Sequence, residues 1–281
     1  MKTMRSALPA LAILLTLTAC AEPQPAVDAE PAAEAADEAQ AAAPQSVWES
    51  GGLKVTALRD AASFPGASLS LAGVPPASSL PSGPMALDFT VEGYELGAQT
   101  ADAGELGLAN SGQGQHIHLI VNNGPYSAHY VDDFDKELED GYYVLLAFLS
   151  RSYHMSLKDP AAAVVTDVMI GDPGPHTMAD LSAPHLFYSR PKGTYEGADA
   201  ERLMLDFYLV NTELSADGNK VRATINGNEF VFTEWLPYVI EGLPMGEVEI
   251  RLELIDGDGS PVPGPFNDVT RTVTLASADA E

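Results

Sequence analysis

The sequence predicts an all-β protein with two tandem β-sandwich domains of the immunoglobulin-like or cupredoxin-like kind, behind a signal peptide and a disordered linker. Three observations lead to this fold class. Apolar residues fall in short runs rich in Val, Ile, Leu, Tyr and Phe, with Gly, Pro and other turn residues between them. No stretch after the linker keeps a helical apolar period for three turns. The chain also repeats itself weakly, which indicates a duplicated domain.

The start of the chain follows the pattern of an export signal. A basic start precedes an apolar run from Ala7 to Leu17, which is shorter than the roughly 20 residues that a transmembrane helix needs. The motif Leu-Thr-Ala-Cys that ends at Cys20 resembles the lipobox of bacterial lipoproteins, at which the signal is cut before a lipidated cysteine. This resemblance implies a signal peptide over residues 1–19 and an acyl anchor on Cys20.

The same resemblance implies a location. In lipoproteins an aspartate after the anchored cysteine favours the inner membrane, and here Ala21 stands at that position. We therefore expect the outer membrane, with the protein facing the periplasm or the cell surface. Palmitate or similar acyl chains on Cys20 would make the membrane a partner of the protein. Cys20 is the only cysteine, so no disulfide is expected.

Composition separates a linker from the folded part. Residues 20–46 are mostly Ala, Glu, Pro, Asp and Gln, and such a segment buries too little apolar surface to fold. The whole chain carries a formal net charge of −26. This charge argues against nucleic acid as a partner, because a phosphate backbone would be repelled. An envelope protein or a small ligand remains as the candidate partner.

An internal duplication divides the folded part into two domains, which we place at residues 47–172 and 180–281. The matched stretches are 86–96 with 204–214, 116–122 with 220–226, 141–149 with 246–254, and 164–170 with 269–275. The stretch around His116 and the Leu-Asp-Phe-Tyr stretch at 205–208 resemble two-domain exported bacterial proteins with sandwich folds. This resemblance implies the fold and carries no activity.

The duplication also orients the strands, because side chains alternate between the two faces of a strand. The outward positions Lys220 and Arg222 of the second copy correspond to His116 and His118 of the first. We therefore expect the two histidines on the solvent-facing side. The inward positions are Val221, Ala223 and Ile225 in the second copy, and Ile117, Leu119 and Val121 in the first.

The next matched strand is apolar on both faces in the first copy only. Its outward positions are Val144, Leu146 and Phe148, where the second copy has Glu249, Arg251 and Glu253. An apolar outer face of this kind needs a cover. Packing of the two domains is the first expectation, and the inserted segment, a partner or a ligand are the alternatives.

The sharpest chemical feature is the pair His116 and His118. Two imidazoles on one strand face can bind one metal ion if a third ligand comes from a neighbouring element. The first candidate for that ligand is His154, in the turn after the apolar strand, and the second is His129. Met155 beside the turn would suit Cu(I). The pattern predicts a copper or zinc site, and a hydrogen-bonded polar cluster without metal is the alternative.

A second hypothesis is an anion site. Arg151 and Lys158 flank the turn, and Arg190 and Lys192 share a later loop. An arginine fork can bind a carboxylate or phosphate ligand, although such loops also pair with the protein's own carboxylates. No nucleophile–base pair or nucleotide motif is visible. We therefore expect a non-catalytic binding module of the envelope, or a structural or assembly protein without a small ligand, rather than an enzyme.

Overall fold

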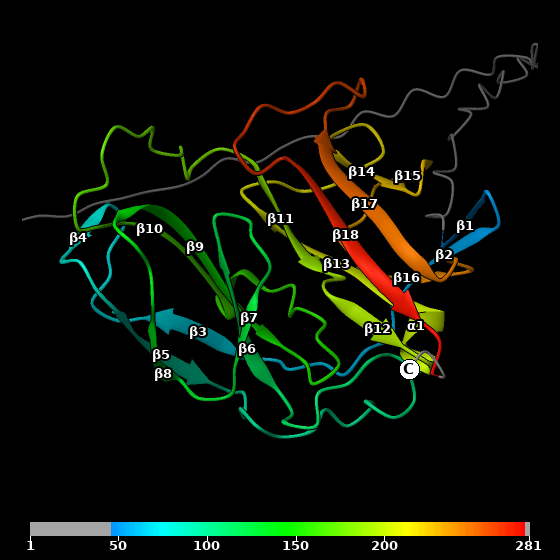
Figure 1. Ribbon diagram of the computed structural model, residues 1–281, viewed down its shortest axis with the longest axis horizontal. Helices are drawn as coiled ribbons and strands as arrows, with labels where there is room; N and C mark the ends of the chain where they lie inside the picture. Colours follow the sequence, from blue (N-terminus) through cyan, green and yellow to red (C-terminus); the bar gives the residue numbers. More distant parts are fainter. Residues whose placement is uncertain (1–45, 279–281) are drawn as a thin grey trace, which may run out of the picture. The chain divides into compact units, whose positions relative to one another are not determined.

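The computed structural model describes residues 46–278, and their regular structure is almost entirely β-strand (Figure 1). Within this range the helical elements are η1 (Pro160–Ala162), a 3-10 turn, and α1 (Ala198–Glu201). The all-β fold class is thus confirmed. No helix among the described residues has the length and apolar character needed to cross a membrane. The predicted signal peptide, Cys20 and the linker up to residue 45 lie outside the described residues.

The first β-sandwich packs a five-stranded sheet against a three-stranded sheet. The order of the larger sheet is β4 (Ser78–Leu80), β10 (Ala163–Ile170), β9 (Gly141–Ser150), β6 (His116–Val121) and β7 (Ser127–His129). The order of the smaller sheet is β3 (Ser68–Leu71), β5 (Met85–Glu92) and β8 (Asp133–Lys136). The core between them contains Leu87 from the smaller sheet and Ile117 and Leu119 from β6, as alternation predicts.

The second β-sandwich has two five-stranded sheets. One sheet has the order β12 (Thr194–Glu196), β18 (Asp268–Ala276), β17 (Gly246–Ile255), β14 (Lys220–Ile225) and β15 (Asn228–Phe232). The other has the order β1 (Val47–Ser50), β2 (Leu53–Ala57), β16 (Tyr238–Glu241), β13 (Arg202–Val210) and β11 (His185–Arg190). Val221, Ala223 and Ile225 of β14 are fully buried in the core between these sheets, as predicted.

The two sandwiches repeat one strand order, which bears out the duplication. The matched stretches form β5 and β13, β6 and β14, β9 and β17, and β10 and β18. An edge strand runs parallel to the last strand of each copy, β4 to β10 and β12 to β18. The registers also correspond, because His116 lies opposite Ser150 just as Lys220 lies opposite Ile255. His116 and Lys220 therefore occupy equivalent positions.

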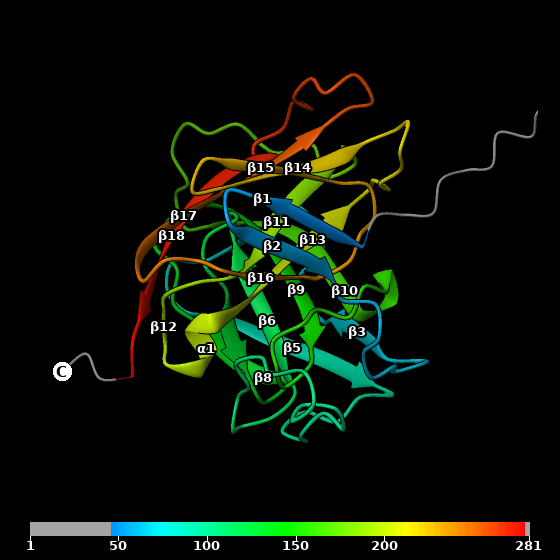
Figure 2. The same ribbon diagram turned by 90° about the vertical axis from the view of Figure 1, so that its right-hand side faces the viewer.

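The predicted boundary of the first domain needs a correction at its N-terminal end. Strands β1 and β2 fall within the predicted range 47–172, yet β2 pairs with β16 of the second sandwich (Figure 2). Alternation explains this pairing, because Leu53, Val55 and Ala57 share one face of β2 and are buried in the second core. The first sandwich is therefore inserted between two segments of the second.

The second sandwich covers the outer apolar face of the first. This confirms the expectation that the two domains pack against each other on this face. Ile120, Leu146 and Phe148 form a buried cluster with Phe187 and Tyr208, which come from β11 and β13. The rings of Phe148 and Tyr208 stack with centroids 5.0 Å apart. The two copies thus share an apolar interface on the face that carries the histidines.

Candidate metal centre

Strand β6 places His116 and His118 side by side. They are two residues apart on one strand, so they share a face, and that face is opposite the one on which Ile117 enters the first core. Pairing with β9 sets His116 opposite Ser150 and His118 opposite Phe148. The prediction that the two histidines share the outer face of the strand is confirmed.

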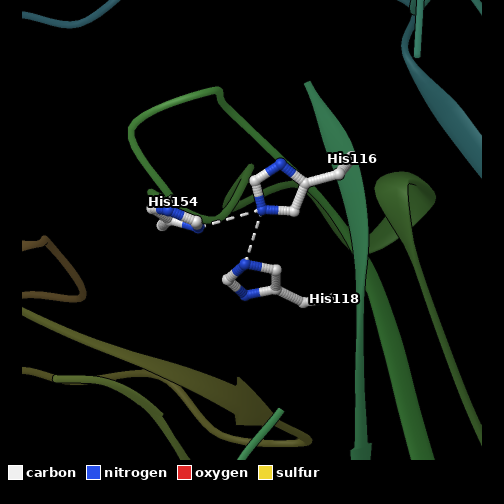
Figure 3. A group of neighbouring side chains, drawn as sticks. All are labelled: His116, His118 and His154. Carbon is white, nitrogen blue, oxygen red and sulfur yellow. Dashed lines mark hydrogen bonds between the residues drawn. The ribbon is translucent and has the colours of Figure 1, made fainter. Parts of the chain in front are cut away.

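The turn after β9 brings the third imidazole to this pair. His154 has a φ of 67°, in the left-handed region, and its backbone N–H donates to the carbonyl of Arg151. The N–H of Arg151 donates to the carbonyl of Met155 at 2.9 Å, which closes the turn. This conformation returns the chain toward β6, and Figure 3 shows the ring of His154 pointing at His116 from the loop.

The ring nitrogens of the three histidines converge (Figure 3). His116 Nε2 lies 2.8 Å from His118 Nε2 and 3.1 Å from His154 Nδ1. One nitrogen from each of the three rings lies within 4.8 Å of the others, which makes this cluster a potential site for a metal ion. The structure therefore brings together the strand pair and the first candidate for a third ligand.

The hydrogen bonds show which nitrogens are free. His116 Nδ1 donates to the carbonyl of Gly114 at 2.7 Å, so its Nε2 presents a lone pair to the cluster. That single lone pair faces both neighbouring rings, and it can accept from only one of them. His118 Nδ1 is buried without a hydrogen-bond partner among the described residues. Hydrogen bonding alone therefore leaves the cluster incompletely satisfied.

All three imidazoles are held in the neutral form. Burial lowers the pKa of His116 to about 4, against a smaller opposite effect of the hydrogen bond to Gly114. Burial, followed by the charge of Arg190, lowers the pKa of His154 to about 2. Burial also lowers the pKa of His118 well below its ordinary value. Neutral imidazole is the form that binds a metal ion.

The expectation that the pair faces solvent is wrong, because His116 and His118 are both fully buried. Their equivalents in the second copy behave as predicted, since Arg222 is partly exposed and forms an ion pair with Glu253 at 3.0 Å. In the first copy Phe148 takes the place of that glutamate and lies against His118, 5.2 Å between ring centroids. The face is the same, but in the first copy the second sandwich and the loops cover it.

Tyr126 is a site residue that sequence reasoning missed. Its ring stacks on His118 with centroids 3.6 Å apart, and its hydroxyl lies 3.3 Å from His154 Nδ1. The loop that carries it is fixed by Asn123, whose side chain donates to the carbonyls of Leu186 and Phe266 in the second sandwich. A tyrosine after a Gly-Pro turn gives no sequence signal of this contact, which depends on that loop docking.

His129, the second candidate for the third ligand, is not part of the cluster. It lies opposite Ile117 in the pairing of β6 with β7, so its side chain belongs to the other face of the sheet. Its ring stacks on Phe134 with centroids 3.5 Å apart. Met155 is also directed elsewhere, because its side chain is buried in an apolar cluster with Leu108 and Met204.

The alternative anion site is wrong for Lys158, which the protein's own groups satisfy, and the protein also occupies most of the donors of Arg151. Lys158 Nζ forms a buried ion pair with Asp206 at 2.8 Å. Arg151 donates through Nε and Nη2 to the carbonyl of Ala62 and through Nη1 to that of Ser156. The ammonium of Lys158 has no donor left for a small anion, because it also donates to Ser156 and to the carbonyl of Phe207, and Arg151 is held to backbone carbonyls by three of its five N–H donors.

Arg190 and Lys192 lie next to the histidines instead. Lys192 Nζ donates to the backbone carbonyl of Tyr126 and lies 3.9 Å from the centre of its ring. Arg190 is buried, and its Nε donates to the hydroxyl of Tyr195 at 3.1 Å. Both charges help to lower the pKa of His154.

Comparisons with known proteins identify no relative by sequence, since no family model and no curated protein matches this chain. Among solved structures, the fibronectin(III)-like modules of CbhA from Clostridium thermocellum match at a TM-score of 0.27 and 13% identity, over 76% of this chain and 96% of that one. SGBP-B of the mixed-linkage glucan utilization locus of Bacteroides ovatus matches at 0.24 and 13%, over 74% and 47%. The two tandem V-type regions of VCBP3, a v-region-containing chitin binding protein, match at 0.22 and 10%, over 74% and 99%. The fold and the site define the class of protein: two β-sandwiches with a three-histidine cluster, of which His116 and His118 are fully buried.

Proposed function

We propose that this protein is a metal-binding module that holds a copper or zinc ion through His116, His118 and His154. The observation that carries the proposal is the convergence of one ring nitrogen from each histidine within 4.8 Å of the others. Strand alternation, strand pairing and a left-handed turn each contribute to this convergence. Three imidazoles are a common protein ligand set for zinc, and imidazole also suits copper.

The spacing of the nitrogens supports the proposal. Two ligands at 2.0–2.1 Å from one ion, at trigonal or tetrahedral angles, lie about 3.3–3.6 Å apart. The separations of 2.8 Å and 3.1 Å from His116 Nε2 are shorter than that range by less than an ångström, and the nitrogens of His118 and His154 lie within 4.8 Å of each other. Small rotations of the rings would therefore admit an ion. The hydrogen bond from His116 Nδ1 to Gly114 already holds one ring in the required tautomer.

The surroundings favour retention of an ion over turnover of a substrate. His116 and His118 are fully buried, and the partly buried His154 is the member of the cluster nearest to solvent. Tyr126 and Phe148 shield His118 on either side. Such enclosure suits a single bound ion better than a substrate that must enter and leave. We therefore propose a non-catalytic role.

Titration of the purified chain with copper and zinc tests this function. We compare the native protein with His118→Gln and with His154→Asn, because Asn tolerates the left-handed backbone of the turn. His129→Asn is the matched control, since His129 belongs to the same sandwich but faces away from the cluster. The expected result is one equivalent of metal for the native protein and the control, and a loss of at least tenfold in affinity for both cluster variants. Equal binding by all four proteins, or no binding by any, would leave a purely structural cluster.

We also propose that Cys20 anchors the protein to the outer membrane. The support is the lipobox-like motif that ends at Cys20, followed by Ala21. In membrane fractions of expressing cells, the native chain should sediment with the outer membrane and enter the detergent phase of a Triton X-114 partition. Cys20→Ala should lose both properties. The proposal fails if this variant still partitions into detergent.

A further inference from the structure

The charges around the three histidines are a feature that the proposed function does not yet explain. The three imidazoles would be uncharged ligands. The positive charges of Arg190 and Lys192 are close enough to lower the pKa of all three histidines. Among the described residues, neither Arg190 nor Lys192 forms a salt bridge with a carboxylate. An ion in this site would therefore add its charge to a region that already holds two positive charges.

Contacts with the ring of Tyr126 determine how far the ammonium of Lys192 lies from the imidazole of His118. His118 covers one face of the Tyr126 ring at 3.6 Å, so Lys192 Nζ, 3.9 Å from the centre of that ring, must lie over the other face. The ammonium is then about 7–8 Å from the imidazole of His118, with only an aromatic ring between them. At this distance in a protein interior, a unit positive charge repels a bound cation and weakens its binding.

Contacts also determine the position of the second charge, the guanidinium of Arg190. Arg190 is 6% exposed, and its Nη1 lies 3.5 Å from the backbone carbonyl of Tyr153, the residue before His154. Its guanidinium therefore lies against the turn that carries the third ligand. Arg190 is the last residue of β11 and Lys192 lies in the loop that follows, so the second sandwich supplies the positive charge around ligands of the first.

We propose that this site selects monovalent copper over divalent metal ions, because Arg190 and Lys192 repel an ion that is bound by three uncharged ligands. This inference rests on the proposed three-histidine site. The repulsion energy is proportional to the charge of the ion. It therefore lowers the logarithm of the affinity twice as much for Zn(II) and Cu(II) as for Cu(I). Cu(I) accepts coordination by three nitrogens and needs no anionic ligand.

The test compares ions of different charge on the intact chain. Affinities are measured for Cu(I) under anaerobic reducing conditions, for Ag(I) as a redox-inert monovalent probe, and for Zn(II), each by competition with a chromophoric chelator. In the native protein we expect tighter binding of Cu(I) and Ag(I) than of Zn(II). Lys192→Met should raise the affinity for Ag(I) about tenfold and that for Zn(II) about a hundredfold, because the repulsion scales with ion charge.

Two control variants separate charge from structure. Lys192→Arg keeps the charge and should leave the preference unchanged, and Lys54→Met removes an exposed lysine that pairs with Glu241 in the second sandwich. If Lys192→Met changed the affinities for Ag(I) and Zn(II) by the same factor, the effect would be structural. The proposed selection by charge would then be overturned. Tighter binding of Zn(II) than of Cu(I) by the native protein would also overturn it, and would leave the metal site itself intact. Binding of no metal would instead contradict the proposed function.

Discussion

At the scale of single residues, the histidines of the first sandwich show how burial fixes a protonation state. Desolvation disfavours imidazolium, so a buried histidine without an acidic partner stays neutral. This is the cause that lowers the pKa of His116 and His154, and it also acts on His129, outside the cluster. The metal-free protein should therefore lose stability in acid through these groups.

His129 provides a test of this effect away from the proposed ligands. Burial lowers its pKa to about 4, with a smaller contribution from Lys136. Between this value and the ordinary pKa of about 6.5 the unfolded chain binds a proton that the folded protein does not. Its contribution to the free energy of unfolding is therefore fully present above pH 6.5 and falls as the pH drops toward 4, by up to about 3 kcal/mol.

We expect His129→Gln to show a shallower decrease in the free energy of unfolding between pH 7 and pH 4 than the native protein. Urea unfolding at several pH values measures this slope. The exposed His176 supplies the control variant, His176→Gln, which should follow the native slope. If the free energy of unfolding of His129→Gln fell with pH as steeply as that of the native protein, the lowered pKa of His129 would be contradicted.

How much of the site the sequence could predict depends on which contacts are local. The shared face of His116 and His118 follows from alternation along one strand, and it was predicted. The closeness of His154 was a hypothesis from the neighbouring turn, and the structure bears it out. Burial of the pair was missed because it depends on the docking of Tyr126 and the packing of Phe148 on Tyr208, contacts between distant parts of the chain.

At the scale of elements, β9 and β17 show one strand used in two environments. Both strands have ten residues and pair in the same way with their neighbours β6 and β14. The outer face of β17 is charged and partly exposed, while the outer face of β9 is apolar and covered by the second sandwich. The contrast was readable from the sequence once the duplication had aligned the two strands.

Exchanging one pair of equivalent residues tests this difference. Leu146 is fully buried at the interface, and its equivalent Arg251 is 41% exposed and paired with Asp268. Leu146→Arg should reduce the free energy of unfolding by about 3 kcal/mol or more, because it buries an unpaired charge. Arg251→Leu removes the ion pairs with the exposed Asp268 and with Glu253, but Glu253 keeps its pair with Arg222, so we expect a smaller loss of about 1 kcal/mol. Similar urea midpoints for the two variants would argue against a close-packed interface at Leu146.

At the scale of the whole described chain, the second sandwich is discontinuous in sequence. Its sheet begins with β1 and β2, continues after the entire first sandwich, and is joined where β2 pairs with β16. The sequence predicted two sandwiches but assigned this hairpin to the first. Proximity along the chain favoured that assignment, whereas the actual partner of Val55 is Ile240, which nothing local to β2 indicates.

A fragment that contains residues 174–278 should therefore be unstable by itself. It lacks the side chains of Leu53, Val55 and Ala57 from its core, and β16 would have an unpaired edge. We expect a loss of at least about 3 kcal/mol relative to a version that carries residues 46–58 on a flexible linker. Chemical denaturation followed by circular dichroism compares the two. A fragment as stable as the linked version would mean that the hairpin is only an accessory.

The discontinuity also determines how the protein would respond to tension. A pull applied at residue 46 and at residue 278 enters the molecule through β1 and leaves through β18, and both strands belong to the second sandwich. The stretch from β3 to β10 lies between them in sequence but outside this line of force for as long as β2 remains paired with β16. The three histidines would therefore stay mechanically unloaded until the hairpin is torn from its sheet, and only then would the first sandwich begin to extend.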